Sequence, residues 1–170
     1  MRQQLLRGLV AYWSLSEASG TRVDAWGAND LTDNNTVTGN PGKVGNASQF
    51  TRANTEYLSS ADTADLSVAD IEFCFAAWVY LDSEPAAGMT VISKNTSGTN
   101  REYRLTWNNT TQRFNWQAFD SGGTSIGTAD ATTFGATATA TWYFLYCYHD
   151  PVANTLGLSV NNGTINTVAT

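Results

Sequence analysis

Carboxylates are the first residues to consider for chemistry, because two of them about 5 Å apart can hydrolyse a glycosidic bond with retention. Alternate positions of a strand would place such a pair on one face, but Glu72, Glu102 and Asp120 each stand alone in the sequence. Asp82 and Glu84 do alternate, although the proline that follows them indicates a turn. The acidic residues therefore predict no glycosidase.

Other catalytic sites lack the residues they need. The chain has one histidine, His149, which could act as a general base. No nucleophile lies in a recognisable motif beside it, so a structural histidine at a strand end is favoured. A catalytic zinc site is not expected, because the chain has too few histidine ligands. A phosphate loop is not expected either, because Gly122, Gly123 and Gly127 are not accompanied by the lysine and the helix that such a loop needs. We expect no catalytic residue, no enzymatic activity and no required cofactor.

Four carboxylates near the N-terminus raise the question of calcium. Glu17, Asp24, Asp30 and Asp33 are close in sequence, and calcium takes oxygen ligands from carboxylates and carbonyls. A structural calcium ion is therefore one interpretation, although the spacing is not that of an EF-hand. Aspartate also fills turns, because its side chain accepts hydrogen bonds from the nearby backbone. The sequence favours solvated turn residues over a calcium site.

Residues 101–120 combine aromatic rings with polar side chains. Rings stack on the apolar face of a sugar while amide, carboxylate and guanidinium groups bond its hydroxyls, so this mixture suits a glycan. Tyr103, Leu105 and Trp107 share one strand face and are expected in the core, whereas Asn115, Gln117 and Phe119 fall on the opposite face from Phe114 and Trp116. The predicted ligand-binding residues are Arg101, Arg113, Asn115, Gln117, Phe119 and Asp120.

The composition limits which classes of partner the chain can bind. The chain has 170 residues, 42% of them hydrophobic, with a net charge of −6 and only two lysines. Nucleic acid and anionic membrane surfaces need clustered cations, so both are excluded, and no run approaches the roughly 20 apolar residues of a membrane span. The N-terminus lacks the apolar segment and cleavage site of a signal peptide. We therefore expect an extracellular protein exported by another route, or a virion protein.

Two apolar runs are expected to form the centre of the fold. Residues 71–81 and 141–150 alternate as strands, and each is apolar or aromatic on both faces. This pattern favours a central strand covered on both sides. We expect Phe73, Phe75, Val79 and Leu145 to be buried.

The rest of the chain reads as short strands separated by turns. Strands are predicted at 8–15, 30–32, 47–52, 56–59, 89–94, 102–107, 112–119, 124–128, 155–160 and 164–168, with a helical turn at 61–68 and a loop at 132–141. Residues 47–52 and 56–59 should form one hairpin, and Asn161-Asn162-Gly163 a second. Strands recurring every eight to twelve residues predict one all-β domain over residues 1–170, an antiparallel two-sheet sandwich.

The order of short motifs resembles a known family. The segments at 8–20, 45–50, 56–58, 76–79, 91–94, 141–144 and 158–163 are similar to successive blocks of the laminin-G-like, concanavalin A-like lectin/glucanase superfamily. The resemblance implies a jelly roll whose two antiparallel sheets include one curved into a groove. It also implies a non-catalytic module, because the Glu-x-Asp-x-x-Glu run of the glucanase branch is missing.

Two further expectations follow from this resemblance. Pentraxins, which are relatives in the superfamily, join a cysteine on each of two strands, and Cys74 and Cys147 resemble that pair. Family members also continue past the last hairpin. The resemblance thus implies that the 164–168 edge meets either more of the same polypeptide or another protein subunit.

Two functions remain open on the sequence. One is a recognition module that binds a glycan or cell-surface polysaccharide. The other is a structural or decorating component of a phage particle, in its capsid or tail, which the Thr/Asn/Gly-rich composition and scarce lysine also fit.

Overall fold

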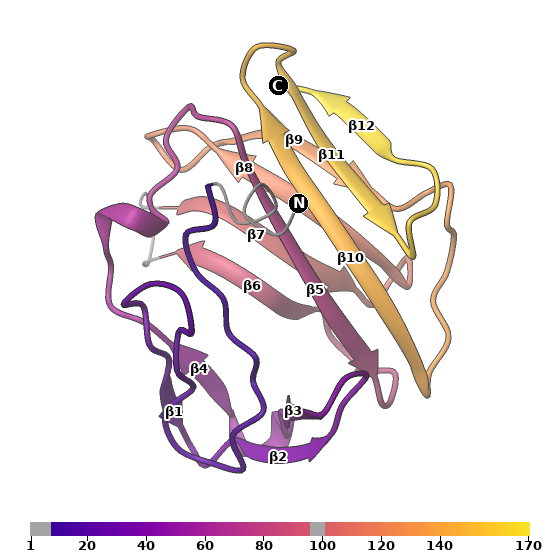
Figure 1. The fold of residues 1–170 in the computed structure, drawn as a ribbon. Helices are drawn as coiled ribbons and strands as arrows, with labels where there is room; N and C mark the ends of the chain where they lie inside the picture. Colours follow the sequence, from indigo (N-terminus) through magenta and orange to yellow (C-terminus); the bar gives the residue numbers. More distant parts are fainter. Residues whose placement is uncertain (1–7, 96–100) are drawn as a thin grey trace, which may run out of the picture. The chain divides into compact units, whose positions relative to one another are not determined.

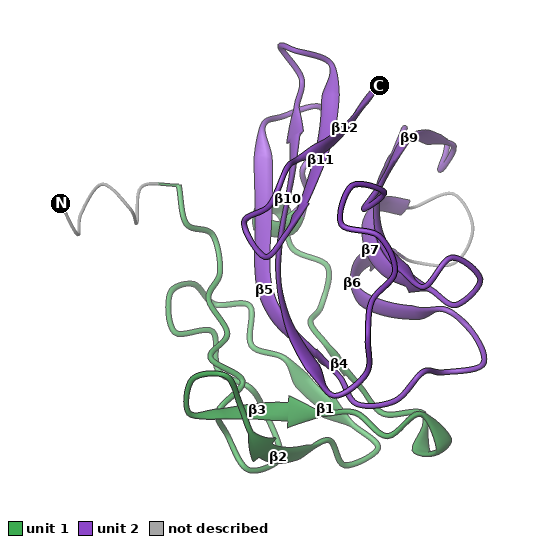
Figure 2. Ribbon diagram, turned by 90° about the vertical axis from the view of Figure 1, so that its right-hand side faces the viewer, with its two compact units in different colours: residues 1–66 green, residues 67–170 purple. Residues whose placement is uncertain are grey.

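The computed structural model describes residues 8–95 and 101–170. The chain divides into two compact units, Met1–Leu66 and Ser67–Thr170, coloured separately in Figure 2. A single domain over the whole chain stays a prediction. No helix among the described residues is long and apolar enough to cross a membrane.

Unit 1 is made of short strands and turns. β1 (Thr32–Asn34) pairs with β4 (Tyr57–Ser59), and β2 (Thr38–Pro41) pairs with β3 (Asn46–Gln49). Two 3₁₀ turns follow β3 and β4, η1 (Arg52–Asn54) and η2 (Ala64–Leu66). The second confirms the helical turn predicted within 61–68.

Two strand predictions in unit 1 are wrong. The segment 8–15 makes only an isolated bridge, Trp13 to Asp24, because the Asp24 carboxylate, and not a partner strand, takes the neighbouring N–H of Tyr12. The predicted hairpin of 47–52 with 56–59 does not form, since β3 and β4 each pair with a different strand. Turn signals mark where a strand ends but do not specify its partner.

Unit 2 contains two four-stranded antiparallel sheets. One has the order β12-β11-β10-β5, made of β12 (Asn166–Ala169), β11 (Thr155–Val160), β10 (Thr141–Asp150) and β5 (Phe73–Leu81). The other has the order β6-β7-β8-β9, made of β6 (Met89–Asn95), β7 (Arg101–Asn108), β8 (Arg113–Phe119) and β9 (Ser125–Asp130). Figures 1 and 2 show these sheets as two layers. The predicted all-β, two-sheet sandwich is confirmed.

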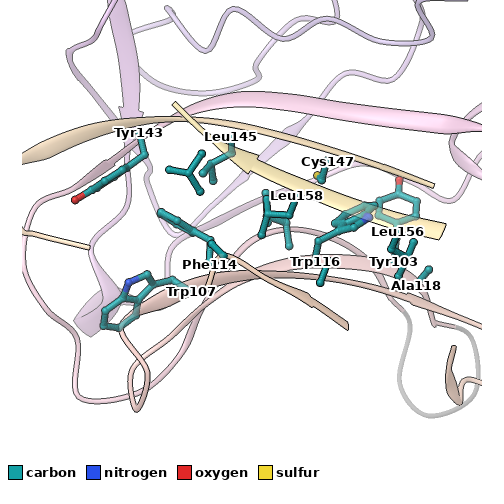
Figure 3. Close-up of a cluster of buried hydrophobic side chains, with 14 residues drawn as sticks. Tyr103, Trp107, Phe114, Trp116, Ala118, Tyr143, Leu145, Cys147, Leu156 and Leu158 are labelled. Carbon is teal, nitrogen blue, oxygen red and sulfur yellow. The ribbon is translucent and has the colours of Figure 1, made fainter. Parts of the chain in front are cut away.

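The core of unit 2 lies between the two sheets. Alternate side chains of β10 and β11 point toward those of β7 and β8 (Figure 3). Leu145, Trp116 and Leu105 are completely buried. The remaining side chains of β7 and β8 must therefore face away from the core, which fixes the outer face of the β6–β9 sheet.

The predicted central position of residues 71–81 is wrong. Among the described residues, β5 is the outermost strand of its sheet, and Leu145 is buried while Phe73, Phe75 and Val79 are only partly so. The outward side chains of β5 stack instead on those of β10: the Trp78 and Phe144 ring centroids are 5.3 Å apart, and those of Tyr80 and Trp142 are 5.1 Å apart. These cross-strand aromatic pairs explain why the second face of β5 is apolar, so a covering layer is not needed to explain it.

The two cysteines lie on neighbouring strands, as predicted, but they do not form a pair. Cys147 is opposite Phe75, and Cys74 is opposite Tyr148. Successive residues face opposite sides of a sheet, so Cys147 is buried in the core while Cys74 is exposed on the outer face, and both are free thiols. The disulfide implied by the pentraxin resemblance is wrong. Burial raises the pKa of both thiols, so neither is an activated nucleophile.

Candidate functional site

The outer face of the β6–β9 sheet carries two rows of polar side chains that cross the strands. The rows follow from the register of the sheet and consist of Thr90, Thr106, Asn115 and Asp130 in one and of Ser93, Arg104, Gln117 and Thr128 in the other. Their neighbours in sequence, such as Leu105, Phe114 and Trp116, are buried in the core. Strand alternation therefore places one polar set on the outer face, where Asn115 is only 9% exposed.

Hydrogen bonds between side chains hold these rows in place. The Arg104 Nε donates to the Gln117 Oε1, and the Gln117 Nε2 donates to the Thr128 Oγ1 at 2.7 Å. In the adjacent row, the Thr106 hydroxyl donates to the Asn115 Oδ1. Polar groups fixed in this way lose little rotamer freedom when a ligand binds.

A groove of about 490 Å³ runs over this face. Its lining includes both rows except Ser93, together with residues 88–89 and 107–109 at the ends of β6 and β7. The volume is in the range of sites for small ligands, and the donors and acceptors along it match a hydroxyl-rich molecule. We refer to this surface as the groove.

The structure brings together part of the predicted ligand-binding set. Asn115 and Gln117 line the groove. Phe119 lies on the same strand beyond them, with the guanidinium carbons of Arg104 and Arg101 at 5.5 and 5.9 Å from its ring centroid. These three predicted residues, Asn115, Gln117 and Phe119, share one outward face, as strand parity indicated.

The other three predicted ligand-binding residues lie in different places. Arg101 joins the Phe119 end of the face, whereas Arg113 begins β8 opposite Asn108 and is not part of the groove lining. Asp120 is not part of the groove lining, and its Oδ1 accepts the N–H groups of Gly122 and Thr124 at 2.9 and 2.8 Å. Aspartate at the start of a turn commonly makes such bonds.

Ten of the twelve groove residues are missing from the sequence prediction, among them Arg104, Thr106, Thr128 and Asp130. Arg104 and Thr106 alternate with the core residues Tyr103, Leu105 and Trp107, so the parity of β7 was a sufficient signal. Thr128 and Asp130 become neighbours of Gln117 and Asn115 only through the register of β9. Sequence alone does not specify that register.

The calcium candidates are not brought together. Among the described residues no group of three or more acidic, histidine or cysteine side chains could hold a metal ion. Each candidate instead accepts backbone N–H groups: Glu17 from Val23, Asp30 from Asp24, and Asp33 from Gly20 and Val37. These are the turn bonds that the alternative interpretation expected.

Asp24 is the most strongly bonded of the four. Its Oδ1 accepts the N–H groups of Tyr12, Trp26 and Gly27 at 2.9 to 3.0 Å, and its Oδ2 accepts that of Asn29 at 3.1 Å. Burial by itself raises the pKa of this carboxyl, but the four backbone donors outweigh burial and lower the pKa to about 2. Asp24 thus organises the turns of unit 1.

The remaining candidates for chemistry have structural partners. His149 is buried, with its Nδ1 3.1 Å from the Ile71 carbonyl oxygen. Glu102 is 3.0 Å from the Lys94 Nζ and accepts the Val68 N–H at 2.7 Å. Glu72 lies just before β5, away from any second carboxylate on that strand.

Unit 2 is thus an antiparallel two-sheet sandwich with a polar groove on the outer face of one sheet. A family model described as the concanavalin A-like lectin/glucanases superfamily matches residues 52–169. The chain belongs to this superfamily. No match is found among curated proteins or among solved structures. The superfamily contains both lectins and glucanases, so membership alone does not assign an activity.

Proposed function

We propose that this protein is a non-catalytic recognition module that binds a glycan, such as a cell-surface polysaccharide, in the groove. The main observation behind the proposal is that two rows of polar side chains lie on the outer face of β7–β9. Hydrogen bonds between neighbouring side chains hold each row in place. Amide and hydroxyl groups at fixed spacing can bond successive sugar hydroxyls without reorganising. Membership of a superfamily that includes lectins adds support.

Catalysis is not part of the proposal. Retaining glycosidases hold two carboxyl groups about 5 Å apart, and inverting ones about 6.5–9.5 Å apart. Asp130 is the one carboxylate in the groove lining. Glu102 on β7 is bound to Lys94 and to the backbone of Val68, which leaves it occupied in a structural role.

The test begins with a glycan array of neutral and acidic oligosaccharides, followed by calorimetry on a glycan that binds. Asn115→Ala or Gln117→Ala should weaken that binding about tenfold, because each removes hydrogen bonds worth roughly 1–1.5 kcal/mol. Asn162→Gly, which removes an exposed amide in the turn between β11 and β12 of the other sheet, is the matched control and should bind normally. The proposal fails if no glycan binds, or if the groove variants bind as tightly as the control.

The second hypothesis, a structural or decorating part of a phage particle, has one structural observation in its favour. Among the described residues β12 is the outermost strand of its sheet, and it contains no lysine or proline to prevent pairing with another strand. Ile165, directly before it, is 44% exposed. A strand from another subunit, or from further polypeptide, would pair along this edge.

Pairing along the β12 edge predicts that the protein associates in solution. Residues 1–170 should form a dimer or larger assembly by multi-angle light scattering, and Thr167→Pro should reduce the mass, because the Thr167 N–H points away from β11 and proline lacks this donor. Thr167→Ala, at the same position, is the control. A stable monomer whose outward Thr167 and Ala169 amides are protected from hydrogen exchange would remove the support for assembly.

A further inference from the structure

One end of the groove is cationic. The guanidinium groups of Arg101 and Arg104 both lie within 6 Å of the Phe119 ring centroid, a distance at which a cation is attracted to the ring face. Phe119 follows Asn115 and Gln117 on the outward side of β8. Two positive charges therefore lie against the Phe119 ring, beside the last polar row of the groove.

These two charges are not neutralised by the acidic residues around them. Glu102, between them in sequence, has its carboxylate 3.0 Å from the Lys94 Nζ and bonded to the Val68 N–H. The Asp120 carboxylate accepts backbone N–H groups of its own turn. Asp130 belongs to the row of Thr106 and Asn115, one row farther along the strands than Arg104.

Arg101 also has a donor that lacks an acceptor among the described residues. Its Nε is buried, and the Nε of Arg113 shares this property. Buried donors are nearly always paired in folded proteins. In a chain with net charge −6 and nine Lys and Arg residues, two arginines beside one ring indicate a place for an anionic group.

We propose that the groove selects glycans that carry a carboxylate-bearing sugar, and that Arg101 and Arg104 bind this carboxylate above the Phe119 ring. The inference rests on the proposed function and names the class of sugar. The guanidinium group presents a fork of N–H donors that matches the two oxygens of a carboxylate. A neutral sugar next to it would lie over Thr106 and Asn115.

The charge pattern also limits how many acidic sugars the groove takes. Asp130 lies in the next row, and a second carboxylate placed there would meet a like charge. The preferred ligand therefore has an isolated acidic sugar in an otherwise neutral chain. A continuous polyanion is disfavoured, in agreement with the acidic net charge of the protein.

Matched glycan pairs test this inference. One pair is an oligosaccharide ending in glucose and its homologue ending in glucuronic acid, and the other is lactose and sialyllactose. The two pairs distinguish a uronic from a sialic acid source of the carboxylate. In calorimetry at low salt, the acidic member of at least one pair should bind about tenfold or more tightly than its neutral partner, and added NaCl should reduce this ratio.

Arginine variants test whether Arg101 and Arg104 cause the preference for acidic glycans. Arg101→Gln and Arg104→Gln should each bring the acidic-to-neutral affinity ratio toward one, while Arg104→Lys should keep part of it because it retains the charge but loses the fork. Arg113→Gln makes the same charge change on the same sheet. It lies six residues before Phe119 on β8, about 20 Å along a strand, and should leave the ratio unchanged. Thermal melting confirms that each variant is folded.

The outcomes separate the two proposals. Equal affinity for the acidic and neutral members of both pairs overturns the carboxylate preference but leaves glycan binding in place. Binding of no glycan overturns both. A preference for acidic glycans that Arg113→Gln weakens as much as Arg104→Gln also overturns the inference, because it would reflect general electrostatic attraction and not this site.

Discussion

Trp116→Ala is expected to lower the free energy of unfolding of unit 2 by about 3–5 kcal/mol, the usual cost of truncating a buried tryptophan. Trp116 is completely buried and lies 5.7 Å from Phe73 and 5.9 Å from Tyr103 between ring centroids. Its Nε1 also donates to the Tyr148 carbonyl at 3.1 Å. Since small domains have only about 5–15 kcal/mol of stability, this loss is a large fraction of the total. Urea titration followed by far-ultraviolet circular dichroism measures the change.

Two tryptophan variants act as controls for this prediction. Trp116→Phe keeps a ring in the core but loses the hydrogen bond to Tyr148, so its loss should be smaller. Trp78→Ala removes a tryptophan that is 45% exposed and stacks on Phe144, which should cost about 1 kcal/mol. If Trp78→Ala were as destabilising as Trp116→Ala, the assignment of inner and outer faces would be wrong.

Asp24→Ala is expected to destabilise unit 1 by about 3 kcal/mol, because it leaves four backbone N–H groups without their acceptor. Asp24→Asn should cost less, since its single carbonyl oxygen can retain part of the bonding. Asp65→Asn removes a charge from an exposed residue of the same unit and should be nearly neutral. Hydrogen exchange at the amides of Tyr12, Trp26, Gly27 and Asn29 reports the effect directly.

The same carboxylate gives a dependence on pH. The pKa of Asp24 is about 2 in the folded protein and 3.8 is its ordinary value, so the unfolded state binds the proton more readily. The stabilisation is therefore fully present above about pH 4 and is lost as the pH falls through about 2. In Asp24→Asn this acid-induced component should be absent. Equal acid sensitivity in the wild type and the variant would contradict the assignment.

Local alternation could predict much of the fold and part of the site. The parity of β7 and β8 separates core residues such as Leu105 and Trp116 from outward residues such as Asn115 and Gln117, because a strand side chain has only two directions. The final hairpin also follows from local chemistry: Asn161 and Asn162 adopt positive φ angles in the turn between β11 and β12.

Properties that depend on strand pairing could not be read from the sequence. The offset that places Cys147 opposite Phe75 puts the two cysteines on opposite faces, and a shift by one residue would have reversed this. The edge position of β5 likewise depends on which strands pair, and aromatic stacking makes its outer face as apolar as a buried one. Asp130 enters the groove only because β9 pairs with β8.

The most direct test of the central claim is to map a bound glycan by nuclear magnetic resonance. The protein is labelled with ¹⁵N and titrated with a glycan selected on the array. We predict that the side-chain amide signals of Asn115 and Gln117 and the backbone amides of 104–106 and 128–130 shift together, while the Trp78 and Trp142 indole signals on the outer face of the other sheet do not. Shifts confined to those indoles, with the groove amides unchanged, would contradict glycan binding in the groove.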